Sequence, residues 1–399
     1  MPRRTPPAVF FFLIIPYGTS FGFVSVALPF VATHRGISVE AIGGIVALAF
    51  APHGYKFLWA PLVDSTLTRK KWFLGSLLLV AGGSFACLAM PITQASLGSL
   101  TAVVVVSQIG LTFLAMTCQA FMGTCLAPEE KGRGAGWYQA GAFVGGGAGG
   151  GAALFLAQHL QGWQAGAIVG GVMLLCAIPL RWVVEPAVVE RATLPDAIRT
   201  LGRELKLIVV SRGGRLGLLI CLLPVGAGAA QNLFGALALS WNASERVVAL
   251  ATGLLGGVAA AGGAVLGGRL ADRVSRRVVF ALGGGLMALC ALAMALGPRN
   301  ATAFVVFTLA YQIASGLGRA AFIGFVLETI GTTAVATKYA IFASMLNVTI
   351  FVMTRLDSSA HARWGSTGLL LADAALTAIG VAVLLVVVHR TRRPYAVTP

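Results

Sequence analysis

The chain has 399 residues, of which 57% are hydrophobic and only 11% are charged. A soluble domain carries about 25% charged residues, so this composition excludes a mostly water-facing exterior and predicts an integral membrane protein. The formal charge of +16 would suit a nucleic-acid partner, unless the basic residues are distributed by membrane side.

Twelve apolar stretches follow one another along the chain, each close to the roughly 17–25 residues that a membrane-spanning helix needs. We predict spans at 8–32, 40–63, 72–92, 98–121, 134–157, 165–183, 214–239, 247–268, 278–297, 301–327, 338–357 and 367–388. No stretch alternates like a barrel strand, so the predicted fold class is an all-α membrane protein of twelve transmembrane helices. The first stretch is too long for a signal peptide and is expected to be retained.

The basic residues lie mainly on one side of these predicted spans. With a cytoplasmic N-terminus, 22 of the 29 Lys and Arg residues fall in the cytoplasm, as the positive-inside rule requires. Both termini are therefore expected in the cytoplasm, and no nucleic-acid partner is predicted. The six cysteines show no CxxC spacing, which favours free thiols over a metal site.

One long polar interruption divides the spans into six and six. Residues 184–213 contain apolar positions at helical spacing and are predicted to form an amphipathic helix on the cytoplasmic surface. The predicted organisation is thus an N-terminal bundle at 8–183, this linker, a C-terminal bundle at 214–388, and a cytoplasmic tail at 389–399.

Two landmarks recur in both halves with nearly the same period. Asp64 and Asp272 each follow a span and are 208 residues apart, whereas Lys131 and Lys338 each open a helix and are 207 residues apart. Such a period indicates a duplicated unit. Six spans leave the second copy in the same orientation, so we predict two parallel-repeat six-helix bundles, as in the major facilitator superfamily.

The stretch 268–277 resembles the cytoplasmic loop signature of that superfamily. It pairs an aspartate at a helix end with nearby arginines, and we predict that it forms a latch that holds one conformation. A basic loop is the alternative, which explains the arginines but not the Gly–Asp–Arg spacing. The predicted latch residues are Asp64, Gly268, Asp272, Arg273, Arg276 and Arg277.

Three further stretches resemble the peptide/acetyl-coenzyme A transporter family, which contains the AmpG-type muropeptide permeases, siderophore permeases and acetyl-coenzyme A carriers. They are Ile15–Gly18 with Ala27–Pro29, Tyr55–Asp64, and Ala336–Ser344. The resemblance implies a muropeptide, siderophore or coenzyme-like cargo and the bacterial inner membrane. The sequence shows no obvious thirteenth or fourteenth span of the kind found in the longer muropeptide permeases. This difference favours the siderophore permeases of the family.

Two cations lie deep within predicted spans. Lys56 precedes Asp64 by eight residues and Arg319 precedes Glu328 by nine, which places both about 12–13 Å into the membrane at 1.5 Å per residue. Ionisable groups at this depth cost several kcal/mol and mark functional sites. One cation from each half predicts a site for an anionic group, although snorkelling or pairing with a neighbouring acid is the alternative.

Polar side chains at helical spacing suggest a pathway around these cations, although each stripe alone is also explained by hydrogen bonds between helices. The predicted substrate-binding residues are Lys56, Arg319, Gln312, Tyr311, Ser315, His53, Gln108, Gln119, Gln231, Asn232, Asn347 and Tyr17.

Proton coupling requires a titratable group inside the membrane. Asp373 and His53 are the candidates, His53 because an imidazole titrates near neutrality. Arg355 lies near the same predicted level as Asp373, so an outer Asp373–Arg355 salt bridge is the preferred interpretation of that carboxylate.

The sequence therefore predicts a secondary active transporter that imports an anionic, muropeptide-like solute with protons. Its predicted partners are that solute, protons and membrane lipid, as a monomer with no cofactor or metal. No nucleotide-binding Walker segment is present. The alternatives are a siderophore or coenzyme-like anion permease, a membrane-embedded enzyme acting on lipid-linked substrates, and a binding sensor.

Overall fold

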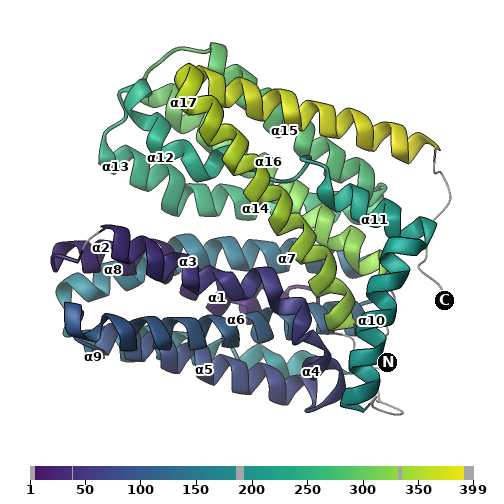
Figure 1. Cartoon of the computed structure of the whole chain (residues 1–399), viewed down its shortest axis with the longest axis horizontal. Coiled ribbons are helices and arrows are strands. Elements are labelled where there is room, and N and C mark those ends of the chain that lie inside the picture. Colours follow the sequence, from purple (N-terminus) through teal and green to yellow (C-terminus); the bar gives the residue numbers. More distant parts are fainter. Residues whose placement is uncertain (1–4, 38, 186–192, 331–334, 391–399) are drawn as a thin grey trace.

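The computed structural model describes residues 5–37, 39–185, 193–330 and 335–390. Every regular element in these ranges is a helix, which confirms the predicted all-α class. Figure 1 shows the helices in two neighbouring bundles, one from each half of the chain, with both chain ends at one end of the molecule.

The helices up to residue 182 lie together in the first bundle (Figure 1). They are α1 (Val9–Gly22), η1 (Phe23–Ala27), α2 (Leu28–His34), α3 (Val39–Tyr55), η2 (Lys56–Leu58), α4 (Ala60–Ser65), α5 (Arg69–Ala89), η3 (Gln94–Ser96), α6 (Leu97–Cys125), η4 (Pro128–Glu130), α7 (Lys131–Val144), η5 (Gly145–Gly149), α8 (Gly150–His159), α9 (Gly162–Leu175) and η6 (Ile178–Trp182).

The helices after residue 211 form the second bundle (Figure 1). They are α11 (Arg212–Leu222), η7 (Ala230–Leu233), α12 (Phe234–Leu237), η8 (Ala238–Trp241), α13 (Glu245–Val248), η9 (Ala249–Leu254), α14 (Leu255–Arg273), α15 (Arg276–Leu296), α16 (Ala301–Thr329) and α17 (Val335–Arg390). Between the bundles, α10 (Leu194–Val210) lies across the end that carries both termini, which we call the linker end.

By length and composition, eight helices of the described chain can cross a membrane. One of these, α17, contains two legs, because Gly365 with φ 64° and ψ −162° interrupts its helical backbone. Three other predicted spans consist of shorter helical pieces, and the first of them contains the apolar helix 9–25. The structure is therefore consistent with the predicted twelve-helix fold, with several spans interrupted rather than continuous.

The predicted seventh span is broken in its middle. Residues 223–229 form no helix between α11 and η7, where Pro224 removes a backbone donor and Gly228 adopts φ +56°. Unwound backbone at membrane depth is tolerated where it is covered by protein or lines a cavity. Ala227 and Ala229 are both buried, so this break lies inside the protein.

The second span is also irregular, at the position of the predicted cation. Lys56 begins the 3-10 turn η2, and Pro61 follows at the start of α4. A 3-10 turn rises about 2.0 Å per residue instead of 1.5 Å. Lys56 therefore lies slightly deeper than a continuous helix would place it.

The two bundles touch backbone to backbone where α7 and η5 meet α14. A Cβ atom on Gly268 would lie 2.8 Å from the Cα of Gly136, and one on Gly257 would lie 3.4 Å from the Cα of Gly147. Only glycine permits this approach. The contact holds the two halves side by side while the other helices surround it.

Candidate functional site

In the first bundle, a hydrogen-bonded series of polar side chains fixes His53. Its Nε2 lies 3.1 Å from Oε1 of Gln108, and the Nε2 of Gln108 donates to the Ser20 hydroxyl at 3.1 Å. The Tyr17 ring meets the imidazole edge-on, with 5.9 Å between centroids. Three predicted site residues are thus brought together with Ser20, which the sequence analysis did not single out.

Lys56 lies next to this group and is only 7% exposed. Its ammonium is close enough to His53 for the two side chains to interact electrostatically. Across residues 5–37, 39–185, 193–330 and 335–390, no salt bridge or hydrogen bond of the Lys56 amine is found. The predicted alternative, pairing with a neighbouring acid, is therefore not observed for this residue.

In the second bundle, Arg319 faces the break in the seventh span. Its Nη2 donates to the backbone carbonyl of Ala227 at 3.5 Å, while its Nε is buried and has no hydrogen-bond partner among the described residues. The buried hydroxyl of Ser315, one helical turn away, also has no partner. A Cβ on Gly228 would lie 3.2 Å from this hydroxyl and 3.1 Å from Nε2 of Gln231, so these three groups surround the unwound backbone.

Two contacts join these groups across the bundles. The Arg319 guanidinium and Tyr17 are close enough to interact electrostatically, and the Asn347 amide donates to the backbone carbonyl of His53 at 3.5 Å. Lys56, His53, Tyr17 and Arg319 therefore form a continuous series from one half of the molecule to the other.

The remaining predicted substrate residues are distributed around this series. Gln119 donates to the Tyr138 hydroxyl at 2.8 Å, and Asn232 donates to Thr354 at 3.3 Å. Tyr311 donates to Asp373 at 3.0 Å, and Gln312 is 9% exposed on the same helix. Gln119 and Asn232 thus have partners of their own outside the series, whereas Tyr311 also interacts electrostatically with Arg319.

The preferred interpretation of Asp373 as half of an Asp373–Arg355 salt bridge is wrong. Asp373 accepts from Tyr311 and lies beside the carboxyl group of Asp357. The Arg355 guanidinium instead lies over the Phe351 ring, 5.5 Å from its centroid, and the residue is exposed. Asp373 and Arg355 were predicted to lie at a similar depth, but a similar depth does not ensure that two side chains lie on helix faces that meet.

At the linker end, two aspartates tie the bundles together reciprocally. Asp272 of α14 accepts hydrogen bonds from the backbone N–H groups of Gly132 and Arg133, both at 2.8 Å. Asp64 of α4 accepts from the backbone N–H groups of Ala336 at 3.3 Å and Thr337 at 3.0 Å. Each carboxylate thus binds the N-terminus of a helix in the other bundle, where the helix dipole favours an anion.

Arg276 strengthens the Asp272 tie. Its guanidinium lies 3.7 Å from Asp272, donates to Glu328 at 3.1 Å, and donates to the backbone carbonyl of Pro128 in the other bundle at 2.5 Å. The Lys131 amine also crosses to the Leu327 carbonyl at 3.0 Å. The structure therefore describes a state in which the two bundles are joined at the linker end.

The other predicted latch residues occupy different places. Gly268 is in the glycine contact between α7 and α14 described above. Arg273 is exposed, and the Arg277 guanidinium lies 5.5 Å from the centroid of the Phe325 ring. Among the predicted latch residues, Asp64, Asp272 and Arg276 make the cross-bundle bonds described above.

Three residues near these groups were not predicted from the sequence. Tyr138 and Tyr339 are buried and interact with Tyr17, and Asp357 is fully buried beside Asp373. Tyr339 lies within Ala336–Ser344, one of the stretches that resemble the peptide/acetyl-coenzyme A transporter family. This resemblance was the sequence signal that could have identified it. The pairing of Asp357 has no local sequence signal, because its partner becomes visible only when the two legs of α17 are placed side by side.

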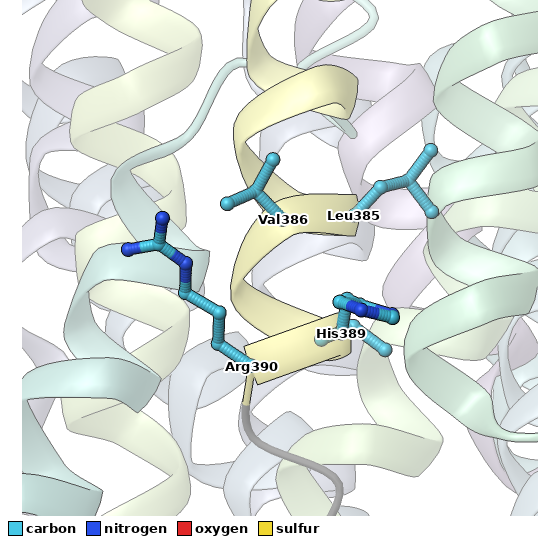
Figure 2. A pocket seen from close by; sticks show the side chains of 5 residues that line it. Leu385, Val386, His389 and Arg390 are labelled. Carbon is cyan, nitrogen blue, oxygen red and sulfur yellow. The ribbon is translucent and has the colours of Figure 1, made fainter.

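A surface pocket lies apart from all of these groups, on the last turns of α17. Figure 2 shows Leu385, Val386, His389 and Arg390 around it, and Val388 completes its lining. None of the predicted site residues belongs to this pocket.

Comparisons with known proteins agree with this architecture. The family model of the Major Facilitator Superfamily matches residues 10–228, and no curated protein matches the chain significantly. The human organic anion transporter MFSD10 (TETRAN) has a similar structure with a TM-score of 0.74 at 16% identity, covering 96% of this chain and 100% of that one.

Two proton symporters also share the fold. The proton:xylose symporter XylE superimposes with a TM-score of 0.70 at 14% identity, covering 98% of this chain and 96% of that one. The E. coli fucose:proton symporter FucP gives 0.69 at 16% identity, covering 95% and 98% respectively. At these identities the similarity is one of fold alone.

Proposed function

This chain belongs to the major facilitator superfamily, a family of secondary transporters, and we propose that it carries an anionic solute through a site between its two bundles. The observation that carries this proposal is the series Lys56–His53–Tyr17–Arg319, with a buried cation from each half at its two ends. Rocking of the halves about a central site exposes such a group to either side in turn.

The chemistry of the two cations favours an anion as cargo. Lys56 lacks a counter-ion within the described chain, and Arg319 bonds only a backbone carbonyl while its Nε is unsatisfied. A buried charge without a partner is costly. A carboxylate or phosphate group of the solute would supply the missing partner to both, with Arg319 offering its planar fork.

The orientation proposed for the chain follows from its basic residues. The linker end carries Asp64, Asp272 and α10, where the predicted cytoplasmic Lys and Arg residues cluster. We place this end, with both termini, in the cytoplasm of a bacterial inner membrane. The state described is then closed to the cytoplasm, ready to receive solute from the opposite side, as an importer requires.

The solute class proposed first is a muropeptide, driven by protons, because the stretch 56–64 resembles the peptide/acetyl-coenzyme A transporter family. A siderophore or a coenzyme-like anion is the alternative within the same family. Each of these solutes carries the anionic groups that the two cations would bind. An enzyme acting on lipid-linked substrates is the alternative from another class, and it would convert its substrate without accumulating it.

Uptake into proteoliposomes tests the proposal. We would offer a labelled muropeptide, a ferric siderophore or acetyl-coenzyme A, with and without an inward proton gradient. Lys56→Ala and Arg319→Ala should each reduce uptake at least about tenfold, since a hydrogen bond to a charged group contributes roughly 1.5–3 kcal/mol.

Matched controls are available at exposed cations. Lys71→Ala at the start of α5 and Arg355→Ala, whose guanidinium lies over Phe351, should transport like the wild type. All four variants should elute and unfold like the wild type. Normal uptake in both Lys56→Ala and Arg319→Ala would exclude the anion site, and turnover of substrate without accumulation would exclude transport.

A further inference from the structure

Two carboxyl groups face each other inside the second bundle. Asp357 is 0% exposed and Asp373 is 1% exposed, and their side chains are close enough to interact. Each lies eight residues from Gly365, at which the two legs of α17 meet. Both are therefore about 12 Å from that turn along antiparallel helices, and the turn lies at the end opposite the linker (Figure 1).

No cation neutralises this carboxyl pair in the part of the chain that the structure describes. On α16 the Tyr311 hydroxyl donates to Asp373, and on α15 Cys290 interacts with Tyr311. On α17 itself, Arg355 is exposed over Phe351, and Nδ1 of His361 is buried without a partner. The neighbouring helix η7 contributes only the neutral residues Ala230–Leu233.

Electrostatics then requires a proton at the pair. Two ionised carboxylates about 4 Å apart repel by about 4 kcal/mol even at an effective dielectric constant of 20. Carboxylates that share a buried site therefore keep one proton between them. In the part of the chain that the structure describes, no donor bonds either oxygen of Asp357 or Oδ1 of Asp373, so acceptors for that proton are available.

The pair is also connected to the proposed anion site. The backbone N–H of Ala230 donates to Asp373, and the carbonyl of Ala227 accepts from Arg319. These two backbone groups lie three residues apart at the end of the break in the seventh span. The carboxyl pair and Arg319 thus hold the same short segment of unwound backbone from two sides.

We propose that Asp357 and Asp373 together bind the single proton that drives transport, and that residues 227–230 connect this proton to Arg319. The coupling role rests on the proposed function, transport of a solute, whereas the existence of the proton site does not depend on it. When the proton leaves, the negative charge on the pair rises by one unit. The Ala230 N–H then interacts more strongly with Asp373. Because Ala227 lies in the same short segment, this change alters the hydrogen bond that its carbonyl accepts from Arg319.

Infrared spectroscopy of the full chain in liposomes tests the proton site without any solute. The wild type at pH 7 should show a protonated-carboxyl C=O band that shifts in D₂O. Asp357→Asn should abolish this band, because the new amide and Tyr311 both donate to Asp373 and stabilise its carboxylate. Asp272→Asn, which changes a carboxylate already bonded to backbone N–H groups, should retain it. An unchanged band in Asp357→Asn would overturn the proposal.

Transport assays then separate coupling from solute binding. With a gradient of one pH unit and one proton per solute, the wild type should accumulate solute up to about tenfold. Asp357→Asn should lose this accumulation and still exchange labelled for unlabelled solute across the membrane. Lys56→Ala should lose both activities.

Two transport results would contradict the coupling role. If the Asp357→Asn variant accumulates solute like the wild type, the proton binds elsewhere. If the variant loses exchange, the pair serves solute binding. A wild type that exchanges none of the three solutes would instead contradict the proposed function, and the infrared result would still decide the proton site.

Discussion

The two bundles treat their buried polar atoms differently. In the first bundle, His53, Gln108 and Ser20 form a hydrogen-bonded series, and Trp59 donates to Thr112 at 3.0 Å. Of the twelve buried side-chain atoms without a hydrogen-bond partner in the described chain, two belong to the first bundle and ten to the second. Native proteins satisfy most such atoms, so each exception requires an explanation.

This difference indicates where buried polar groups can gain new hydrogen-bond partners. The unsatisfied atoms of Ser315, Arg319 and Asp373 belong to residues that contact the break in the seventh span, and Asp357 lies beside Asp373. A solute or a proton can supply the missing bonds there. In the first bundle, by contrast, His53, Gln108 and Ser20 are already hydrogen-bonded to one another and provide a more fixed wall for the same site.

The two halves are alike in the aspartate hydrogen bonds at the linker end. Substitutions of these aspartates are expected to have the largest effect on transport. Asp272→Asn should remove charge-assisted bonds to α7 and Arg276, which contribute roughly 1.5–3 kcal/mol, or about 10–150-fold in the balance between states. Turnover in proteoliposomes should slow by more than solute affinity falls.

Asp64→Asn is the matched variant on the other side of the molecule. It loses the equivalent tie to α17, so its turnover should slow in the same direction. Weakened solute affinity at normal turnover in either variant would show that the aspartates do not control the exchange between states.

A smaller effect is expected from breaking the satisfied network of the first bundle. Gln108→Ala leaves His53 and Ser20 without their shared partner, which should destabilise the protein by about 1–3 kcal/mol. Thermal unfolding in detergent would measure this loss. A variant as stable as the wild type would show that the first bundle is not held by its polar bonds.

The smallest effect is expected at Ser315 in the second bundle. Its hydroxyl has no hydrogen-bond partner within the described chain, so Ser315→Ala should change stability by no more than about 0.5 kcal/mol. Solute affinity should nevertheless fall if the hydroxyl binds the solute. A large loss of stability with unchanged affinity would reverse the comparison between the bundles.

Much of the fold could be predicted from the sequence, because the length of an apolar stretch directly determines whether a helix can cross a membrane. The all-α fold class of the superfamily is confirmed. The break at 223–229 was treated as part of one continuous span, although Pro224, Gly226 and Gly228 were present. Proline and glycine at this spacing indicate a break only when neighbouring helices satisfy the backbone that they release.

The candidate site was less accessible to sequence reasoning. Lys56 and Arg319 were singled out from their cost in a membrane, and their role in binding a solute stays a prediction. The pairing of Asp373 was predicted wrongly, since the hairpin at Gly365 sets which faces of α17 meet. The reciprocal bonds of Asp64 and Asp272 depend on how the halves dock, which no local pattern contains.

The most direct test of the account is a double-mutant cycle on solute binding, with Lys56→Ala, Arg319→Ala and the double variant in isothermal titration calorimetry. The titrant is the muropeptide, ferric siderophore or acetyl-coenzyme A, whichever stabilises the wild type most against thermal unfolding. If both cations bind one anionic group, each single variant should weaken binding at least about tenfold, and the double variant by clearly less than the product. Losses that multiply independently, or no loss at all, would contradict a shared anion site between the two halves.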